Sequence, residues 1–318
     1  MTNNHSHSPA PIALILGAAG FIGRNLCRKM AGQGFVVYGI GHGQLSEANR
    51  LEYRISRWLQ ADITLENLCA SFTTSAPTVV VHCCGSGAVS HSYADPVSDF
   101  DRSVTTVQAM LEFCRRQPTP PRAVLASSAA VYGDQGDVDI AEDATLNPVS
   151  PYGYHKVMAE QLCEYYSRFF EIDTRAVRLF SVYGEGLRKQ LLWDALNKLE
   201  QGNYSFFGTG AEIRDWIHVD DAVRLIAAAA ISERPTPLFL NGGNVKASTK
   251  EVLALLARAV DSTLLPEFSG VEHAGNPRRL TADNSQAMAH LGFSGTVTLQ
   301  AGLERYATWF AATRAGGQ

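Results

Sequence analysis

The stretch Gly17-Ala18-Ala19-Gly20-Phe21-Ile22-Gly23 (GAAGFIG) places three glycines at three-residue spacing directly after the apolar run IALIL at 12–16. Glycine allows a sharp strand-to-helix turn and lets the backbone approach a pyrophosphate closely. The next helix adds free N–H groups and the positive end of its dipole. A tight turn alone would also explain the glycines, but the flanking strand and helix pattern favours a dinucleotide-binding loop. We expect the backbone of Gly17, Gly20, Phe21, Ile22 and Gly23 to bind the cofactor.

Short β-rich apolar runs alternate with helical patterns from residue 12 to about residue 179. This alternation with near-continuously apolar strands predicts a parallel sheet covered on both faces, an α/β fold of the Rossmann-type doubly wound class. We expect strands at 12–16, 35–40, 58–60, 79–83, 123–126 and 174–179, and helices near 20–31, 65–72, 99–116 and 152–169.

The rhythm changes after residue 179, where turn-rich segments and helical patterns replace the regular alternation. The run VRLIAAAA at 223–230 and the strand-like LFLN at 238–241 are expected to rejoin the first sheet. The predicted organisation is a disordered lead-in at 1–10, a dinucleotide-binding domain at 11–180 rejoined by about 216–245, and a smaller, mostly helical substrate lobe formed by 181–215 and 246–318.

Composition and charge exclude several kinds of partner. The formal net charge is -4 and no strongly basic run occurs, which argues against nucleic acid and anionic membranes. The six cysteines show neither Cys-x-x-Cys pairs nor zinc spacing, so we expect no metal and a reducing compartment, although Cys83-Cys84 could be a reactive pair. No secretory signal or membrane-length apolar run occurs, so the sequence predicts a cytoplasmic protein.

The end of the second predicted strand bears on the choice between NAD and NADP. An acidic residue there would bind the ribose hydroxyls of NAD. Gly41 and His42 occupy this end instead, which removes repulsion against a 2'-phosphate, but no Arg follows to bind one, so the choice stays open. We expect His42 beside the ribose, and Asp62 with Ile63 beside the adenine, whose amino group Asp62 would bind. A helix N-cap role for Asp62 is the alternative.

Candidate catalytic side chains follow from the segment SPYGYHK at 150–156 and the strand end ASS at 126–128. Tyr152 and Lys156 lie four residues apart on a predicted helix and therefore share a face. A phenol is a poor base at neutral pH unless a nearby cation stabilises the phenolate, and Lys156 supplies that cation. Ser128 is placed to hydrogen-bond the oxygen that Tyr152 would deprotonate. The alternatives are an exposed Tyr-Lys pair, and serines that only satisfy backbone groups.

Five motifs, in this order and spacing, resemble the extended short-chain dehydrogenase/reductase family, and most closely its nucleotide-sugar epimerases, dehydratases and ketoreductases. They are GAAGFIG, SSAAVYG, SPYGYHK, RLFSVYG and RDWIHVDD. The resemblance implies a bound NAD or NADP, with Ser128 as the active-site hydroxyl, Tyr152 as the base and acid, and Lys156 as the ribose-binding lysine. The family's dehydratases carry Asp-Glu where this chain has Ala129 and Ala130, which argues against dehydration.

The resemblance also implies a nucleoside-diphosphate sugar as substrate and a homodimer formed through two helices per subunit. Arg214 matches the residue that binds the diphosphate, with Arg188, Arg278 and Arg279 as weaker candidates. Ser103 and Ser181 stand where the family often has Asn. We expect the sugar pocket to be bordered by Gly85, Ser86, Ser128, Ser181, Arg188 and Arg214.

The leading functional prediction is an epimerase that oxidises and re-reduces a sugar carbon, C4 by preference, through a keto intermediate with tightly bound NAD. The alternative is a 4-ketoreductase that exchanges NADPH, which Gly41 favours. A non-catalytic dinucleotide sensor is the third reading. It needs the glycine loop but not the set of Ser128, Tyr152 and Lys156.

Overall fold

The structure is a computed structural model that describes residues 10–72, 76–85, 87, 89–271 and 277–315. The expected lead-in at 1–10 falls almost wholly outside these residues, as does Ser86.

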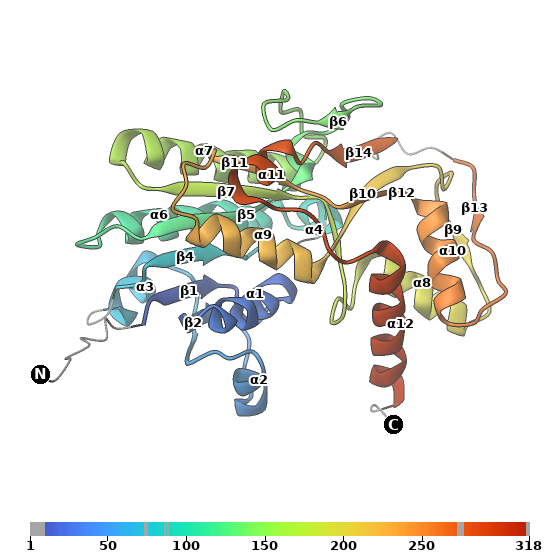
Figure 1. Cartoon of the computed structure of the whole chain (residues 1–318), viewed down its shortest axis with the longest axis horizontal. Helices are drawn as coiled ribbons and strands as arrows, with labels where there is room; N and C mark the ends of the chain where they lie inside the picture. The colour runs from blue at the N-terminus through green and yellow to red at the C-terminus, as the bar shows by residue number, and fades with distance from the viewer. Residues whose placement is uncertain (1–9, 73–75, 86, 88, 272–276, 316–318) are drawn as a thin grey trace, which may run out of the picture.

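A seven-stranded parallel sheet forms the centre of the molecule (Figure 1), in the order β11-β7-β5-β4-β1-β2-β3. Every neighbouring pair in this sheet is parallel, and β4 and β7 are buried along their whole length. The predicted doubly wound sheet is therefore confirmed. Its strands are β1 (Ile12–Leu16), β2 (Val36–Gly41), β3 (Arg57–Gln60), β4 (Val79–His82), β5 (Arg122–Ser128), β7 (Thr174–Leu179) and β11 (Phe239–Gly242).

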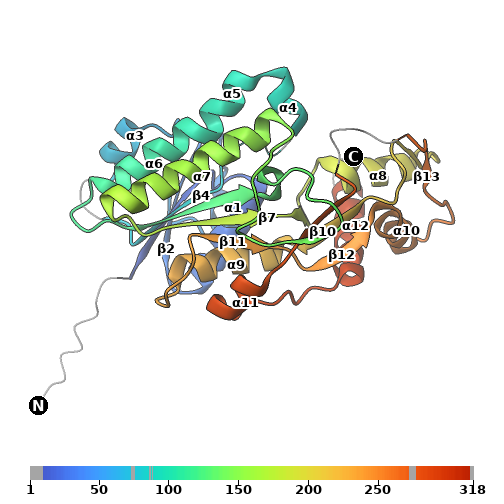
Figure 2. The same ribbon diagram turned by 90° about the horizontal axis from the view of Figure 1, so that it is seen from above.

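Helices cover both faces of this sheet (Figure 2). Side chains alternate along a strand, so β1 sends Ala13 and Ile15 into one core and Leu14 and Leu16 into the other. The first core is closed by α1 (Phe21–Gly32) and α9 (Val219–Ile231), and the second by α3 (Leu65–Ser71), α6 (Thr106–Arg115) and α7 (Pro151–Phe170). The carboxyl ends of β1, β4 and β5 thereby reach one edge between the two helical layers.

The helix expected at 99–116 differs from the prediction. It begins earlier, as α5 (Pro96–Phe100) with Asp95 as its side-chain cap, and widens into a π-helical turn, η1 (Asp101–Thr105), before α6. At this turn the Thr106 hydroxyl donates to the Arg102 carbonyl at 2.7 Å. Hydrophobic periodicity does not reveal local hydrogen bonds of this kind, so the sequence did not predict the π-helical turn. Two further helices were not expected, α2 (Glu47–Glu52) and α4 (Val89–Ala94).

A second, smaller sheet lies beside the first, in the order β12-β10-β14-β6, with β8 paired to β10. Helices α8 (Gln190–Glu200), α10 (Thr249–Ala259) and α12 (Leu299–Ala315) pack into a third core at this end of the molecule (Figure 2). The remaining elements are β6 (Asp139–Ile140), β8 (Ser181–Tyr183), β9 (Ser205–Phe206), β10 (Ile213–His218), β12 (Val245–Ser248), β13 (Glu267–Phe268), β14 (Arg279–Ala282) and α11 (Ser285–Leu291).

The second sheet changes the predicted organisation in one respect. Strand β6 lies within 11–180, yet it pairs with β14 of the late segment. The second sheet therefore includes a strand from residues before 181. The sequence did not predict this pairing, because a two-residue strand is too short to give a periodic signal.

Candidate active site

The glycine loop joins β1 to α1 and leaves backbone donors free for an anion. Gly17 has a φ of 79°, a conformation that favours glycine, and its N–H donates to the Ile40 carbonyl. A Cβ on Gly23 would lie 2.2 Å from the Gly17 carbonyl oxygen, so only glycine lets α1 approach the loop. The N-cap residue is Gly20, which has no side chain to occupy the first N–H groups, and the first turn carries no acidic residue. These features fit a pyrophosphate at the helix N-terminus.

His42 and Asp62, at the ends of β2 and β3, form one hydrogen-bonded pair, with His42 Nδ1 2.7 Å from Asp62 Oδ1. Both side chains are exposed. The alternative N-cap role of Asp62 is wrong, because Thr64 caps α3 by accepting a hydrogen bond from the Asn67 N–H. Ile63 is buried in the core below α3.

The space beside Gly41 is already filled by an aromatic ring. A Cβ on Gly41 would lie 3.1 Å from the indole of Trp58, and one on Gly39 would lie 3.2 Å from the same ring. The two glycines of β2 therefore accommodate Trp58, which explains why no larger residue ends this strand.

Lys156 and Tyr152 lie on one face of α7, which begins with Ser150 as N-cap and Pro151 in its first turn. The Lys156 ammonium nitrogen is 5.8 Å from the centroid of the Tyr152 ring and donates to the Ala126 carbonyl at 3.1 Å. Lys156 is buried, whereas Tyr152 is only half-buried. The alternative of an exposed Tyr-Lys pair is therefore wrong for the lysine.

Gly153 brings the first turn of α7 close to the strand end that carries Ser128. A Cβ on Gly153 would lie 2.5 Å from the Ala130 carbonyl oxygen. The Ala130 N–H in turn donates to Ser128 Oγ at 3.2 Å, so this hydroxyl keeps its proton free for another acceptor. Ser127 does not share this position, because it is buried and donates to Glu160.

His82 is the last residue of β4, lies near the Lys156 charge and is fully buried. Its Nε2 lies 2.7 Å from the Thr106 hydroxyl. Burial and the nearby Lys156 charge lower the pKa of His82 to about 3, so the imidazole is neutral at physiological pH. Ser103, in the π-helical turn, is also buried, and its hydroxyl has no hydrogen-bonding partner among the described residues.

The predicted substrate residues are divided between the second sheet and the carboxyl edge of the main sheet. Arg214 on β10 donates to the Ile213 carbonyl and is held where burial lowers the pKa of its guanidinium. Ser181 on β8 pairs with Trp216, two residues beyond Arg214, so Ser181 and Arg214 lie on the same face of the second sheet. Gly85, after β4, is close to the Lys156 ammonium: a Cβ there would lie 3.8 Å from it. Ser86 lies outside the described residues.

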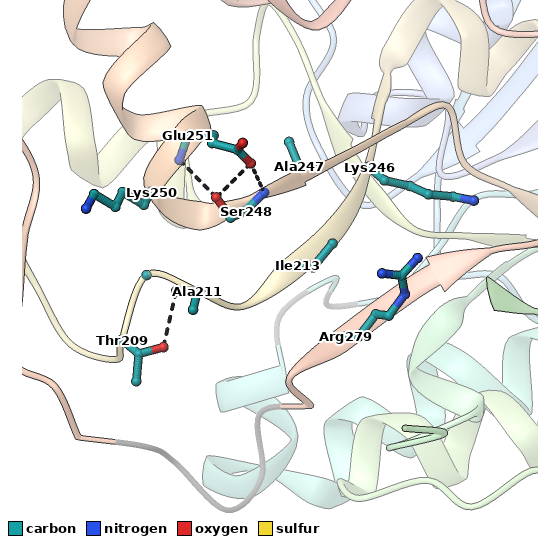
Figure 3. A pocket seen from close by; sticks show the side chains of 10 residues that line it. Thr209, Ala211, Ile213, Lys246, Ala247, Ser248, Lys250, Glu251 and Arg279 are labelled. Carbon is teal, nitrogen blue, oxygen red and sulfur yellow. Dashed lines mark hydrogen bonds between the residues drawn. The ribbon is translucent and has the colours of Figure 1, made fainter. Parts of the chain in front are cut away.

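Arg188 and Arg279 have other neighbours. Arg188 is exposed and its guanidinium lies 5.7 Å from the centroid of the Trp309 ring. Arg279 pairs with Ile213 in the parallel register and therefore lies on the face of the sheet opposite Arg214. It lines a pocket of about 610 Å³ together with Lys246 (Figure 3), and both cations bind Asp139.

The cysteines contribute no reactive thiol pair at this edge. All six are free, and burial raises the pKa of the Cys83 thiol to about 12 and that of Cys84 further. Within the part of the chain that the structure describes, no cluster of potential metal ligands occurs and no helix is long and apolar enough to span a membrane.

The sequence did not indicate the roles of two residues at the site. Ser92 on α4 accepts a hydrogen bond from the Tyr152 N–H at 3.0 Å and so fixes the start of α7. Glu160 lies four residues after Lys156, on the same face of α7, and is buried. The helical spacing of Glu160 could have revealed it, whereas no local pattern marks Ser92.

A glycine loop at a helix N-terminus, beside a buried lysine, a tyrosine and a serine at the carboxyl edge of a parallel sheet, defines a dinucleotide-dependent enzyme. The model of the NAD dependent epimerase/dehydratase family matches residues 13–237, and the chain belongs to this family, whose members are NAD-dependent enzymes of the extended short-chain dehydrogenase/reductase type.

Individual relatives agree over nearly their whole length. The chain is 28% identical to a UDP-glucose 4-epimerase of Mycolicibacterium smegmatis, covering 93% of this chain and 97% of the relative. It is 30% identical to an uncharacterized UDP-glucose epimerase of Bacillus subtilis, covering 91% and 95%. A crystal structure of UDP-glucuronic acid 4-epimerase from Bacillus cereus, in complex with UDP-glucuronic acid and NAD, is similar with a TM-score of 0.84 at 25% identity, covering 95% of this chain and 99% of that one.

Proposed function

We propose that the protein is an NAD-dependent 4-epimerase of a nucleoside-diphosphate sugar, with UDP as the nucleotide. The approach of Tyr152, Lys156 and Ser128 at the end of β5 carries the proposal. The relatives named above act on UDP-sugars by name, and a solved neighbour binds a UDP-sugar together with NAD. Ala129 and Ala130 replace the acidic pair expected of a dehydratase, which favours epimerisation.

In this proposal the chain's own residues hold the sugar and move one proton. Ser128 donates a hydrogen bond to the C4 oxygen and Tyr152 removes the proton from that oxygen, while the Lys156 ammonium stabilises the phenolate. Tyr152 returns the same proton after the keto sugar has rotated to present its opposite face. The glycine loop of Gly17, Gly20 and Gly23 would hold NAD, which would supply the acceptor and donor of the hydride exchanged at C4.

We assign binding of the nucleotide part of the substrate to the second lobe. Arg214 is a half-buried guanidinium, and a diphosphate is the kind of group that such a cation binds strongly. We assign substrate binding to 181–215 and 246–318 and cofactor binding to 11–180 with the returning segment 216–245.

A 4-ketoreductase is the second candidate, because Gly41 leaves no carboxylate at the end of β2 to repel the 2'-phosphate of NADPH. The two functions differ in their use of cofactor. An epimerase returns the hydride that it took, whereas a reductase consumes one NADPH per turnover.

In the deciding experiment, the purified protein is incubated without added cofactor with UDP-glucose, UDP-glucuronic acid or UDP-N-acetylglucosamine. The configuration at C4 is followed by proton NMR. The expected result is an equilibrium mixture of both C4 epimers of one of these sugars. Turnover of a 4-keto sugar only with stoichiometric NADPH would establish the ketoreductase instead. If the protein binds cofactor but converts no sugar under either condition, the result would support a non-catalytic dinucleotide sensor.

We also propose a cytoplasmic homodimer formed through α7 and the α5–α6 helix. Exposed apolar side chains lie along α5 and α7, namely Val97, Phe100, Tyr154, Met158, Tyr165 and Phe169. Light scattering after gel filtration should give twice the chain mass, and Met158→Glu should shift the population toward monomer.

A further inference from the structure

Three side chains at four-residue spacing form one face of α7: Tyr152, Lys156 and Glu160. The last two are hydrogen-bonded to consecutive residues of β5. Lys156 donates to the Ala126 carbonyl at 3.1 Å, and Glu160 Oε1 accepts from the Ser127 hydroxyl at 2.6 Å. The next residue of β5 is Ser128, and the preceding turn of this helix face carries Tyr152.

The Glu160 carboxylate is fixed from a second strand as well. Arg178 on β7 donates from Nε to Glu160 Oε1 at 3.0 Å and from Nη2 to Oε2 at 2.8 Å. Ser127, Glu160 and Arg178 are 4%, 1% and 2% exposed, so the whole cluster is shielded from solvent. The carboxylate is therefore held by directional bonds from two neighbouring strands, through Oε1 from β5 and through both oxygens from β7.

The network continues away from the site. Arg178 Nη1 donates to the Tyr132 hydroxyl at 2.8 Å, and that hydroxyl donates to Asn241 Oδ1 on β11 at 2.7 Å. The guanidinium is also 4.3 Å from the centroid of the Phe239 ring. Arg178 consequently has little freedom to follow Glu160 if α7 moves.

We propose that Glu160 is a positioning residue that sets the rotation and height of α7 over β5, and thereby the distance between Tyr152 and Ser128. Apolar contacts would also hold the helix on the sheet, but they are non-directional and tolerate a small rotation. A buried ion pair contributes little net stability compared with an apolar pair, so its value here lies in direction. The inference rests on the proposed function through the roles assigned to Tyr152 and Ser128.

The position of Glu160 also has an electrostatic consequence. Its negative charge lies one helical turn from Lys156 and is balanced by Arg178. The other titratable groups around the Lys156 ammonium are His82, Cys83 and Cys84 from the β4 edge and Cys163 from α7. A neutral residue at 160 leaves the Arg178 cation unbalanced, which favours the phenolate form of Tyr152.

Two substitutions at the carboxylate separate geometry from charge. Ser127→Ala removes one hydrogen bond and no charge, and should lower kcat about 10- to 100-fold with an unchanged KM and an unchanged acidic limb of the pH profile. Glu160→Gln should lower kcat similarly and also shift that limb to lower pH. Adding Arg178→Met to Glu160→Gln should restore the limb but not kcat.

Arg175→Met is the matched control for Arg178→Met. Arg175 lies on the same strand, is 4% exposed, and donates to carbonyls of Ala229 and Ser232 at the other end of β7. It should lower the thermal midpoint as Arg178→Met does while leaving kcat unchanged. Equal losses of kcat in both variants, or unchanged kcat and pH limb in Ser127→Ala and Glu160→Gln, would overturn the proposal.

The ionisation of Tyr152 gives a second measurement that needs no substrate. It is the ultraviolet absorbance difference, across pH, between a variant and the same variant carrying Tyr152→Phe. A downward shift for Glu160→Gln, absent in Ser127→Ala, supports the electrostatic effect of Glu160 even if none of the sugars is converted. No shift in Glu160→Gln contradicts that effect whatever the substrate is.

Discussion

The ammonium nitrogen of Lys156 lies 5.8 Å from the centroid of the Tyr152 ring, and Lys156 is 3% exposed. A charge in this shielded position acts on the phenol more strongly than an exposed lysine would, because the effective dielectric constant is lower than that of water. Lys156 is held there by its hydrogen bond to Ala126. Because of this geometry, we expect removal of the Tyr152 hydroxyl to have a large effect on turnover.

Tyr152→Phe should strongly lower kcat while leaving the fold and cofactor binding intact. The expected loss in kcat is about 10²- to 10⁴-fold, the usual contribution of general acid–base catalysis. Turnover by NMR and the amount of bound dinucleotide by absorbance are the two measurements. Tyr154→Phe is the control, since Tyr154 is 53% exposed on the same helix. Equal turnover in both variants would remove Tyr152 from the mechanism.

Gly153→Ala should damage both stability and turnover, because its Cβ would lie 2.5 Å from the Ala130 carbonyl oxygen. Overpacking of this kind costs roughly 1–3 kcal/mol. The clash also pushes α7 away from Ser128. Thermal unfolding and kcat test this together, with Gly32→Ala as control, because a Cβ on Gly32 meets no atom within 4 Å. A Gly153→Ala protein with normal kcat would show that the close approach is not needed.

The buried His82 should make the protein less stable as the pH falls below 6.5. Its folded-state pKa is about 3, against an ordinary value of 6.5. Between these values the unfolded chain binds a proton that the folded protein does not, so stability rises with pH there and is lost on acidification. From pH 6.5 to 5 this one group should cost about 2 kcal/mol.

Urea unfolding at the two pH values measures this effect. His82→Asn should flatten the dependence by that amount, and His290→Asn, at a histidine that is not fully buried, should leave it unchanged. An unchanged slope in His82→Asn would mean that folding does not lower the pKa of His82.

Cys83 and Cys84 should resist alkylation in the native protein. Burial raises the pKa of Cys83 to about 12, so almost no thiolate is present at pH 8. Iodoacetamide labelling followed by mass spectrometry should find both residues unmodified before unfolding and modified after it. Rapid labelling of either one in the folded state would restore the idea of a reactive pair.

The main sheet could be predicted because its signals are local. Each strand is a short apolar run ended by turn residues, and the glycine loop fixes where the first helix begins. The second sheet could not, since β6 is two residues long and pairs with β14 about 140 residues later in the chain. Pairing at such separation depends on tertiary contacts that no window of sequence contains.

The candidate site likewise has features that the sequence predicts and features that it does not. Tyr152, Lys156 and Ser128 follow from helical spacing and strand ends, and the structure places them at one edge. The burial of Lys156, the hydrogen bond between His42 and Asp62, and the turn of Arg188 toward Trp309 are set by neighbours far along the chain. The sequence indicates these residue types but not their partners.

Strand β11 pairs with β7 along Phe239–Gly242, although about sixty residues separate the two strands in the chain. During synthesis β7 therefore emerges long before its neighbour, and the edge that β11 will cover stays unpaired until β11 follows it. A ribosome-bound chain ending near residue 180 should bind chaperones, and the same fragment made alone should aggregate. The cofactor sheet is a late product of folding, completed only after the intervening segment has left the ribosome.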